Sequence, residues 1–280
     1  MDDEAIAILG GKGMLGADLV ETCRQQGFDA RIFDLPEFDI TNPEQLKQAL
    51  NTANAIVNCA AYTDVDGAES ERDLAYKVNA EAVGRLGMLA RKAKLWVLHI
   101  STDFVFDGKG ERPYVETDPP NPINEYGRTK LVGEQLLVES GCDNCIMRIE
   151  WTYGRSGNNF VAKLMERAEA TQMLKVVDDQ IGSPTATTEV AKVICKLLRR
   201  RPQGLFHFAA DGHVSRYEMA KFIFSSLSMN VDVVPCKTSD YVTPAARPLN
   251  SRFDCSKIKA LLNEQIEPWQ GPLERFLRRL

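Results

Sequence analysis

The hydrophobic pattern of the chain alternates between short apolar runs and longer segments in which apolar residues recur every three or four positions. Short, mainly apolar segments typical of strands lie at 5–9, 28–33, 55–60, 95–100 and 145–149, and helical spacing marks about 14–20, 43–50, about 70–92 and 126–139. Continuously apolar strands are typical of a sheet that is buried on both faces. Their alternation with helices predicts an α/β fold with a doubly wound parallel sheet of the Rossmann type.

The second half of the chain shows a less regular pattern, from which we expect a smaller lobe. An apolar run at 204–209 predicts one more strand of the main sheet, so the sheet domain would comprise residues 1–150 plus about 189–210. Residues about 151–188 and 211–280, ending in an amphipathic helix at 272–280, would form the lobe. We expect this lobe to cover a cleft at the sheet edge, beside the long glycine- and proline-rich loop at 108–122.

Composition excludes several classes of function. The chain has 280 residues, of which 44% are hydrophobic, and 34 Lys and Arg against 39 Asp and Glu give a net charge of −5. No global positive field is available to hold a nucleic acid or an anionic membrane. The acidic start at 1–4 lacks the features of a targeting peptide, and no apolar stretch approaches the ~20 residues that a membrane helix needs. We therefore expect a cytoplasmic protein.

Seven cysteines, an odd number spread over the chain, favour reduced thiols over a disulfide framework. Cys142 and Cys145 have the spacing of a redox or zinc pair, but no second pair accompanies them, and His99, His207 and His213 form no ligand motif. We expect no metal site from these residues. Magnesium binding and a homodimer are compatible with the sequence, but nothing in it singles out the residues involved.

A glycine-rich turn follows the first apolar run. Gly10, Gly13 and Gly16 have the spacing G-x-x-G-x-x-G between a predicted strand and a predicted helix. Without Cβ atoms the chain can turn sharply and bring backbone N–H groups to a pyrophosphate at the helix N-terminus. A purely structural turn between strand and helix is the alternative, and the position after the first strand favours nucleotide binding.

Asp34 ends the second apolar run, eighteen residues after Gly16. A carboxylate there can accept hydrogen bonds from an adenosine ribose and disfavours a 2′-phosphate, which favours NADH. Lys12 and Arg31 could supply positive charge for NADPH, so the choice between the two cofactors stays open.

Three residues carry candidate chemistry. Thr102 follows a buried strand, at the edge where parallel sheets bind ligands, and Tyr126 and Lys130 stand four residues apart, one turn of a predicted helix. A nearby ammonium stabilises a phenolate, so we expect Lys130 to lower the pKa of Tyr126 and bring proton transfer within range. Each residue alone has a structural explanation, but together they predict a nicotinamide-dependent reductase.

These motifs, with others along the chain, resemble the extended short-chain dehydrogenases/reductases, and within them the dTDP-4-dehydrorhamnose reductase family, over nearly the whole sequence. The matching segments are 10–16, 58–66 with 68–69, 78–79, 101–108, 124–130, 151–154, 158–160, 179–185 and 247–251. The glycine turn and the Tyr-Lys pair occur across the superfamily, whereas the last three segments are more specific.

The resemblance implies a role for each matching residue. Tyr126 would be the proton donor, Lys130 its electrostatic partner and a ribose binder, and Thr102 the hydroxyl that orients the carbonyl, with Asn79 behind Lys130. The implied cofactor-binding residues are Gly10, Gly13, Met14, Leu15, Gly16, Asp34, Asp39, Ile40, Ala61, Tyr62, Thr63, Tyr126 and Lys130. The implied substrate-binding residues are Thr102, Asp103, Phe104, Tyr126, Trp151 and Arg247.

Two positions depart from the family pattern. Phe104 stands where a Tyr is common, which removes a phenolic hydroxyl that could contact a sugar. Glu150 stands where a small or hydroxylated residue is expected, and its carboxylate would either repel a nucleotide diphosphate or face a basic partner such as Arg148 or Arg155.

The implied reaction is NAD(P)H-dependent reduction of the C4 keto group of a nucleotide-linked 4-keto-6-deoxy sugar, as in dTDP-L-rhamnose synthesis for cell-wall polysaccharides. One alternative is an epimerase or 4,6-dehydratase of the same superfamily, although Phe104 cannot move the proton that dehydration requires. Another is a non-catalytic regulatory protein that resembles the β subunit of methionine adenosyltransferase, because fold does not settle function.

Overall fold

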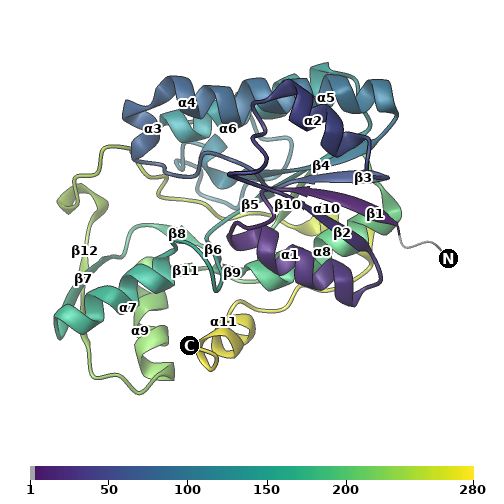
Figure 1. Ribbon diagram of the computed structural model, residues 1–280. Coiled ribbons are helices and arrows are strands. Elements are labelled where there is room, and N and C mark those ends of the chain that lie inside the picture. The colour runs from purple at the N-terminus through teal and green to yellow at the C-terminus, as the bar shows by residue number, and fades with distance from the viewer. Residues whose placement is uncertain (1–3) are drawn as a thin grey trace.

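The computed structural model describes residues 4–280 and contains one six-stranded parallel sheet (Figure 1). The acidic start at 1–3 lies outside the described residues. In sheet order the strands are β10 (Gly204–Phe208), β5 (Asn144–Ile149), β4 (Trp96–Thr102), β3 (Ala55–Asn58), β1 (Ala5–Leu9) and β2 (Asp29–Phe33). All pairings in this sheet are parallel. The expected doubly wound α/β fold, including the return strand at 204–209, is confirmed.

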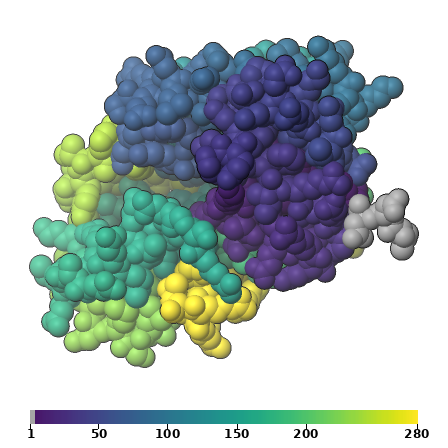
Figure 2. Space-filling model, viewed as in Figure 1, coloured from purple at the N-terminus to yellow at the C-terminus, as the bar shows by residue number. Residues whose placement is uncertain are grey.

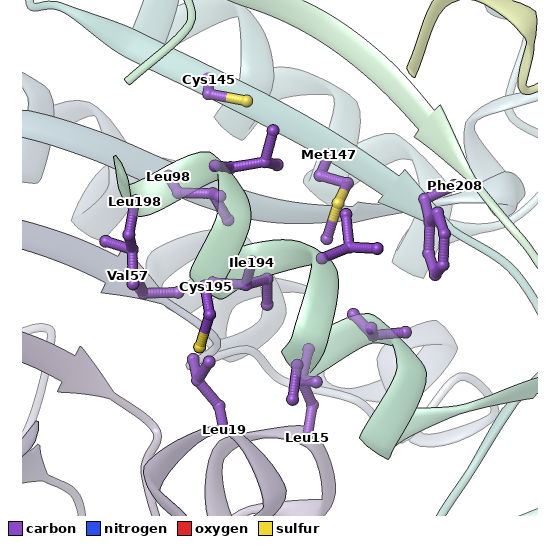
Figure 3. Close-up of a cluster of buried hydrophobic side chains, with 14 of the residues drawn as sticks. Leu15, Leu19, Val57, Leu98, Cys145, Met147, Ile194, Cys195, Leu198 and Phe208 are labelled. Atoms are coloured by element: carbon purple, nitrogen blue, oxygen red, sulfur yellow. The ribbon is translucent and has the colours of Figure 1, made fainter. Parts of the chain in front are cut away.

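Helices cover both faces of the sheet, as the apolar strands require. On one face lie α1 (Met14–Gln25), α8 (Thr187–Arg200) and α10 (Ser256–Leu262), and on the other α2 (Pro43–Leu50), α5 (Ala82–Ala93) and α6 (Glu125–Glu139) (Figure 1). Along β1, Ile6 and Ile8 face the first group, whereas Ala7 and Leu9 face the second. Figure 3 shows side chains of α1, α8 and three central strands meeting in the first of these two layers.

The expected helix at about 70–92 is a nearly continuous helical stretch. It comprises α3 (Gly67–Ser70), α4 (Arg72–Tyr76), the π-helical turn η1 (Lys77–Glu81) and α5. Such π-helical turns are rare and frequently lie at functional sites. Asn79, which lies in this turn, accepts a hydrogen bond from the backbone N–H of Tyr62 at 2.9 Å and donates to Thr129 Oγ1 at 3.1 Å. The turn therefore ties the segment after β3 to helix α6.

The region after residue 150, where the sequence pattern is less regular, contains well-defined helices and strands. It contains helices α7 (Phe160–Ala170), α9 (Arg216–Ser226) and α11 (Gln270–Leu277). Three two-stranded pairs accompany them: β7 (Met173–Val177) with β12 (Asp232–Cys236), β8 (Ile181–Gly182) with β11 (Val214–Ser215), and β6 (Thr152–Tyr153) with β9 (Thr185–Ala186). These elements enclose a third apolar cluster, which includes Leu164, Ile223 and Leu273.

The exact division into sheet domain and lobe stays a prediction, and the packing of α10 bears on it. Ile258 and Leu262 of α10 belong to the apolar layer of α1 and α8, not to the third cluster. The chain therefore returns to the sheet after its second passage through the lobe. Within residues 4–280, no helix is long and apolar enough to cross a membrane.

Candidate active site

The glycine turn between β1 and α1 depends on contacts that only glycine permits. Gly10 has a φ of +77°, and a Cβ there would lie 2.6 Å from the backbone N of Ala60, while a Cβ on Gly16 would lie 2.0 Å from Gly10 O. Helix α1 begins after Gly13 with no side-chain cap and no acidic residue in its first turn. Its free N–H groups and the helix dipole fit the pyrophosphate of a dinucleotide.

Asp34, which follows β2, holds the glycine turn. Its Oδ2 accepts the backbone N–H of Lys12 at 2.7 Å and its Oδ1 that of Leu35 at 2.8 Å. The amine of Lys12 pairs with Glu37 at 2.6 Å, and Arg31 pairs with Asp29 at 2.7 Å. Both cations that the sequence offered for NADPH are therefore engaged by carboxylates.

The other expected cofactor positions lie on segments that follow β2 and β3. Asp39 Oδ1 accepts the N–H of Thr41 at 2.8 Å, and Ile40 is buried. Ala61, Tyr62 and Thr63 follow β3, where Asn79 holds the backbone of Tyr62. Met14 begins α1, next to the buried Leu15, and its sulfur lies 3.7 Å from Asn159 Nδ2 of the lobe. The contacts of these residues with a cofactor stay a prediction.

Thr102 and Tyr126 meet at the end of β4. The Oγ1 of Thr102 accepts the N–H of Phe104 at 3.2 Å and caps the 3₁₀ turn η2 (Asp103–Val105). A Cβ on Gly127 would lie 2.1 Å from Phe104 O, so glycine lets α6 approach this turn closely. The rings of Phe104 and Tyr126 pack edge to face with centroids 5.6 Å apart. Strand and helix thereby bring both hydroxyls to one place.

The pKa of Tyr126 moves in the direction opposite to expectation. Burial raises the pKa of Tyr126 to about 12, and the neighbouring Thr102 hydroxyl opposes this rise. The negative charge of Asp103 adds to it, and Lys130 is not among the causes. The expected lowering by Lys130 is therefore wrong for this structure, because the amine of Lys130 turns towards β4.

Lys130 is buried, and its amine donates to the carbonyl oxygen of Ile100 at 2.7 Å and lies 3.3 Å from Nε2 of His99. Burial lowers the pKa of Lys130 to about 8, against the opposing effects of Glu134 and Cys59. Asn79 contacts Tyr62 and Thr129, the residue before Lys130, and its expected role behind Lys130 stays a prediction.

Sequence analysis missed the role of His99, whose only signal was its place in the strand before Thr102. The Oδ1 of Asn58 accepts the N–H of Ala60 at 3.1 Å, so its Nδ2 donates to Nδ1 of His99, also at 3.1 Å. Burial lowers the pKa of His99 well below its usual range, and the neutral ring then carries its proton on Nε2, facing Lys130. This arrangement favours the neutral amine, in agreement with the low pKa of Lys130.

Asp103, Trp151 and Arg247 come from three separate segments of the chain. Asp103 is buried, and within residues 4–280 its Oδ2 has no hydrogen-bond partner. Burial raises the pKa of Asp103 to about 6, against nearby Ser251, Thr102 and Arg216. Trp151 has a φ of +44°, and Arg247 pairs with Asp66 at 2.9 Å and lies 6.0 Å from the Phe104 ring centroid. Figure 2 shows a hollow where the purple and blue N-terminal half meets the teal part of the lobe.

Glu150 lies beneath Trp151 and is completely enclosed. Its carboxylate accepts the backbone N–H groups of Ser183 at 2.8 Å and Phe253 at 3.2 Å. Burial and the charge of Asp103 raise the pKa of Glu150 well above its usual range. The proposed partner Arg148 is wrong, because that guanidinium pairs with Glu134 at 2.6 Å.

The whole described chain matches one protein family, described as the RmlD substrate binding domain, over residues 4–280. A dTDP-4-dehydrorhamnose reductase of Aggregatibacter actinomycetemcomitans is 36% identical over 97% of each chain. The chain belongs to the dTDP-4-dehydrorhamnose reductase (RmlD) family.

Two further similar proteins, one curated relative and one solved structure, bear on function. The spore coat polysaccharide biosynthesis protein SpsK of Bacillus subtilis is 32% identical over 98% of this chain and 96% of its own. The crystal structure of the Bacillus anthracis dTDP-4-dehydrorhamnose reductase in complex with NADP superimposes with a TM-score of 0.95 at 37% identity, covering 99% of this chain and 100% of that one. Family and fold therefore agree with the resemblance found in the sequence.

Proposed function

We propose that this protein reduces the C4 keto group of a nucleotide-linked 4-keto-6-deoxy sugar with NAD(P)H, converting dTDP-4-dehydro-L-rhamnose to dTDP-L-rhamnose. The observation that carries the proposal is the meeting of the Thr102 and Tyr126 side chains at the end of β4, on the same sheet edge as the uncapped N-terminus of α1. Family membership supports the sugar nucleotide as substrate.

In this proposal Tyr126 is the proton donor. Its raised pKa keeps the phenol protonated at neutral pH, and a phenol remains a far stronger acid than an aliphatic alcohol. Proton transfer from Tyr126 to an alkoxide at C4 is therefore favourable without assistance from Lys130. The hydroxyl of Thr102 donates to Asp103 Oδ1 in the absence of substrate. In this proposal it turns to the substrate, so that Thr102 and Tyr126 together donate hydrogen bonds to the carbonyl oxygen and hold it beside the reduced nicotinamide.

The cofactor, when bound, supplies the hydride. Gly10, Gly13 and the first turn of α1 would hold its pyrophosphate, and Lys130 would hold its ribose hydroxyls. The carboxylate of Asp34 disfavours a 2′-phosphate, whereas the B. anthracis relative binds NADP. We propose that this chain uses either cofactor, with Asp34 setting the preference.

The decisive experiment follows NAD(P)H oxidation with dTDP-4-dehydro-L-rhamnose generated in situ. We expect stoichiometric oxidation by the wild type and a 10²- to 10⁴-fold lower turnover for Tyr126→Phe, the usual effect of losing a general acid. Tyr153→Phe is the matched control, because the Tyr153 hydroxyl is buried without a partner among the described residues, away from the sheet edge. A Tyr126→Phe variant with wild-type turnover contradicts the role of Tyr126.

The same assay separates the alternatives. An epimerase or dehydratase would convert its substrate with a tightly held, recycled NAD and would not consume NAD(P)H. A regulatory protein would show no turnover with any keto sugar, whatever residue stands at position 126.

A further inference from the structure

Arg216 lies between the aromatic rings of Trp151 and Phe160. It is the first residue of α9, and its guanidinium carbon lies 3.4 Å from the ring centroid of Trp151 and 4.6 Å from that of Phe160. A capping box of Ser215 and Glu218 fixes the start of this helix, and the backbone N–H of Arg216 donates to Gln180 O. The side chain is therefore held by its stacking and by a well-anchored backbone.

The guanidinium makes no hydrogen bond and no ion pair with any residue in 4–280, although the side chain is partly buried. Two other arginines near the cleft differ in this respect, since Arg148 pairs with Glu134 and Arg247 pairs with Asp66. Burial lowers the pKa of Arg216 to about 9, partly offset by the charges of Asp103 and Glu150. Enclosed charges in proteins are normally paired, so an unpaired one marks a place where a ligand supplies the missing charge.

The two carboxyl groups nearby do not take this place. Glu150 directs its oxygens to the N–H groups of Ser183 and Phe253, and the Oδ1 of Asp103 accepts from Thr102. The stacked rings cover the flat face of the guanidinium, which leaves N–H donors at its edge for a planar or tetrahedral anion. An arginine in this setting binds phosphate oxygens in preference to neutral groups.

We propose that Arg216, braced by Trp151 and Phe160, is the anchor for the diphosphate of the sugar nucleotide. The inference rests on the proposed function, because it assigns the anion to the substrate. The cofactor also carries a diphosphate, but the glycine turn and the first turn of α1 already provide its site. The sugar would then extend from Arg216 past Asp103 towards Thr102, with its nucleotide end held on the lobe.

The test measures binding of dTDP, thymidine and NADP⁺ by calorimetry to the wild type, Arg216→Gln and Arg216→Lys. We expect Arg216→Gln to bind dTDP about 10- to 100-fold more weakly, the usual effect of losing hydrogen bonds to a charged group, with thymidine and NADP⁺ unchanged. Arg216→Lys should recover part of the affinity, because it keeps the charge but loses the planar fork. Arg278→Gln, an exposed arginine of the C-terminal segment, is the matched control.

A structural role for Arg216 makes a different prediction. Removal of an unpaired enclosed charge should leave the melting temperature of the ligand-free protein unchanged or higher, whereas loss of a structural contact would lower it. Wild-type affinity of Arg216→Gln for dTDP, an equal loss of NADP⁺ binding, or no dTDP binding by the wild type overturns the proposal.

The outcomes also separate this proposal from the reductase function. Arg216-dependent dTDP binding by a protein that never oxidises NAD(P)H would refute the reductase and support the anchor. Normal keto-sugar reduction by Arg216→Gln with an unchanged KM would refute the anchor and support the reductase.

Discussion

The amine of Lys130 lies 3.3 Å from Nε2 of His99 and 2.7 Å from the carbonyl oxygen of Ile100. Both partners belong to β4, the strand that ends at Thr102. The amine is therefore fixed to the sheet, and its protonation depends on a dry environment whose other ionisable neighbours are Glu134 and Cys59.

This contact predicts a pH-dependent stability. The folded pKa of Lys130 is about 8, below the value of an unfolded lysine, so its contribution to stability is present at high pH and lost as pH falls through 8. We expect the unfolding free energy of the wild type, relative to Lys130→Met, to rise by about 2 kcal/mol between pH 7 and 9.5. Urea unfolding at several pH values measures this difference. A difference that does not change with pH would contradict the low pKa of Lys130.

Asp103 predicts a pH dependence of the opposite sign. Its folded pKa of about 6 exceeds that of an unfolded Asp, so its contribution is present below pH 4 and lost as pH rises through 6. We expect Asp103→Asn to gain roughly 2 kcal/mol relative to the wild type between pH 4 and 7. Thermal melts across this range test it. If the stability of the wild type instead rises relative to that of Asp103→Asn over this range, the surroundings of Asp103 stabilise its carboxylate rather than its protonated form.

Asp34 should set the cofactor preference. Asp34→Asn keeps an acceptor for the N–H of Lys12 or Leu35 but removes the negative charge near the expected ribose. We expect the ratio of kcat/KM for NADPH to that for NADH to rise by about fivefold, since one charge pair at close range is worth ~1 kcal/mol in water. Glu44→Gln, on the first turn of α2, is a control whose ratio should not change. An unaltered ratio for Asp34→Asn would place the ribose elsewhere.

Gly182 should matter for the substrate but not for the cofactor. A Cβ there would lie 2.5 Å from Cε2 of Trp151 and 2.7 Å from Oε2 of Glu150, so Gly182→Ala must displace the indole. We expect a KM for the sugar nucleotide raised by roughly tenfold or more, with the KM for NAD(P)H unchanged. Equal changes in both constants would indicate a general distortion of the lobe.

The sequence predicted elements well where a local signal exists. Strands β1 and β3 are short apolar runs that are buried throughout, and α2 begins at Pro43 behind the capping residue Asn42, which accepts the N–H of Glu44. Several lobe strands have only two residues, which is too short for any periodicity.

The chemistry of the site was less predictable because it depends on contacts between distant parts of the chain. The four-residue spacing placed Lys130 on the same helix face as Tyr126. It could not predict the direction of the Lys130 amine, which is set by its contacts with His99 and Ile100. Glu150 follows directly after strand β5, which ends at residue 149, so the sequence suggested the nearby Arg148 as its partner. In the structure, Arg148 pairs instead with Glu134 of helix α6. Arg216 gave no signal, since 65 positions separate it from Trp151 in the sequence.

The chain leaves the sheet for the lobe after β5, returns for α8 and β10, leaves again, and comes back once more for α10. Helix α8 packs in one apolar layer with α1, which opens the glycine turn (Figure 3). A fragment cut after residue 150 would lack α8 and expose the apolar face of α1 to water. The apolar layer behind the glycine turn is thus assembled from segments on both sides of residue 150.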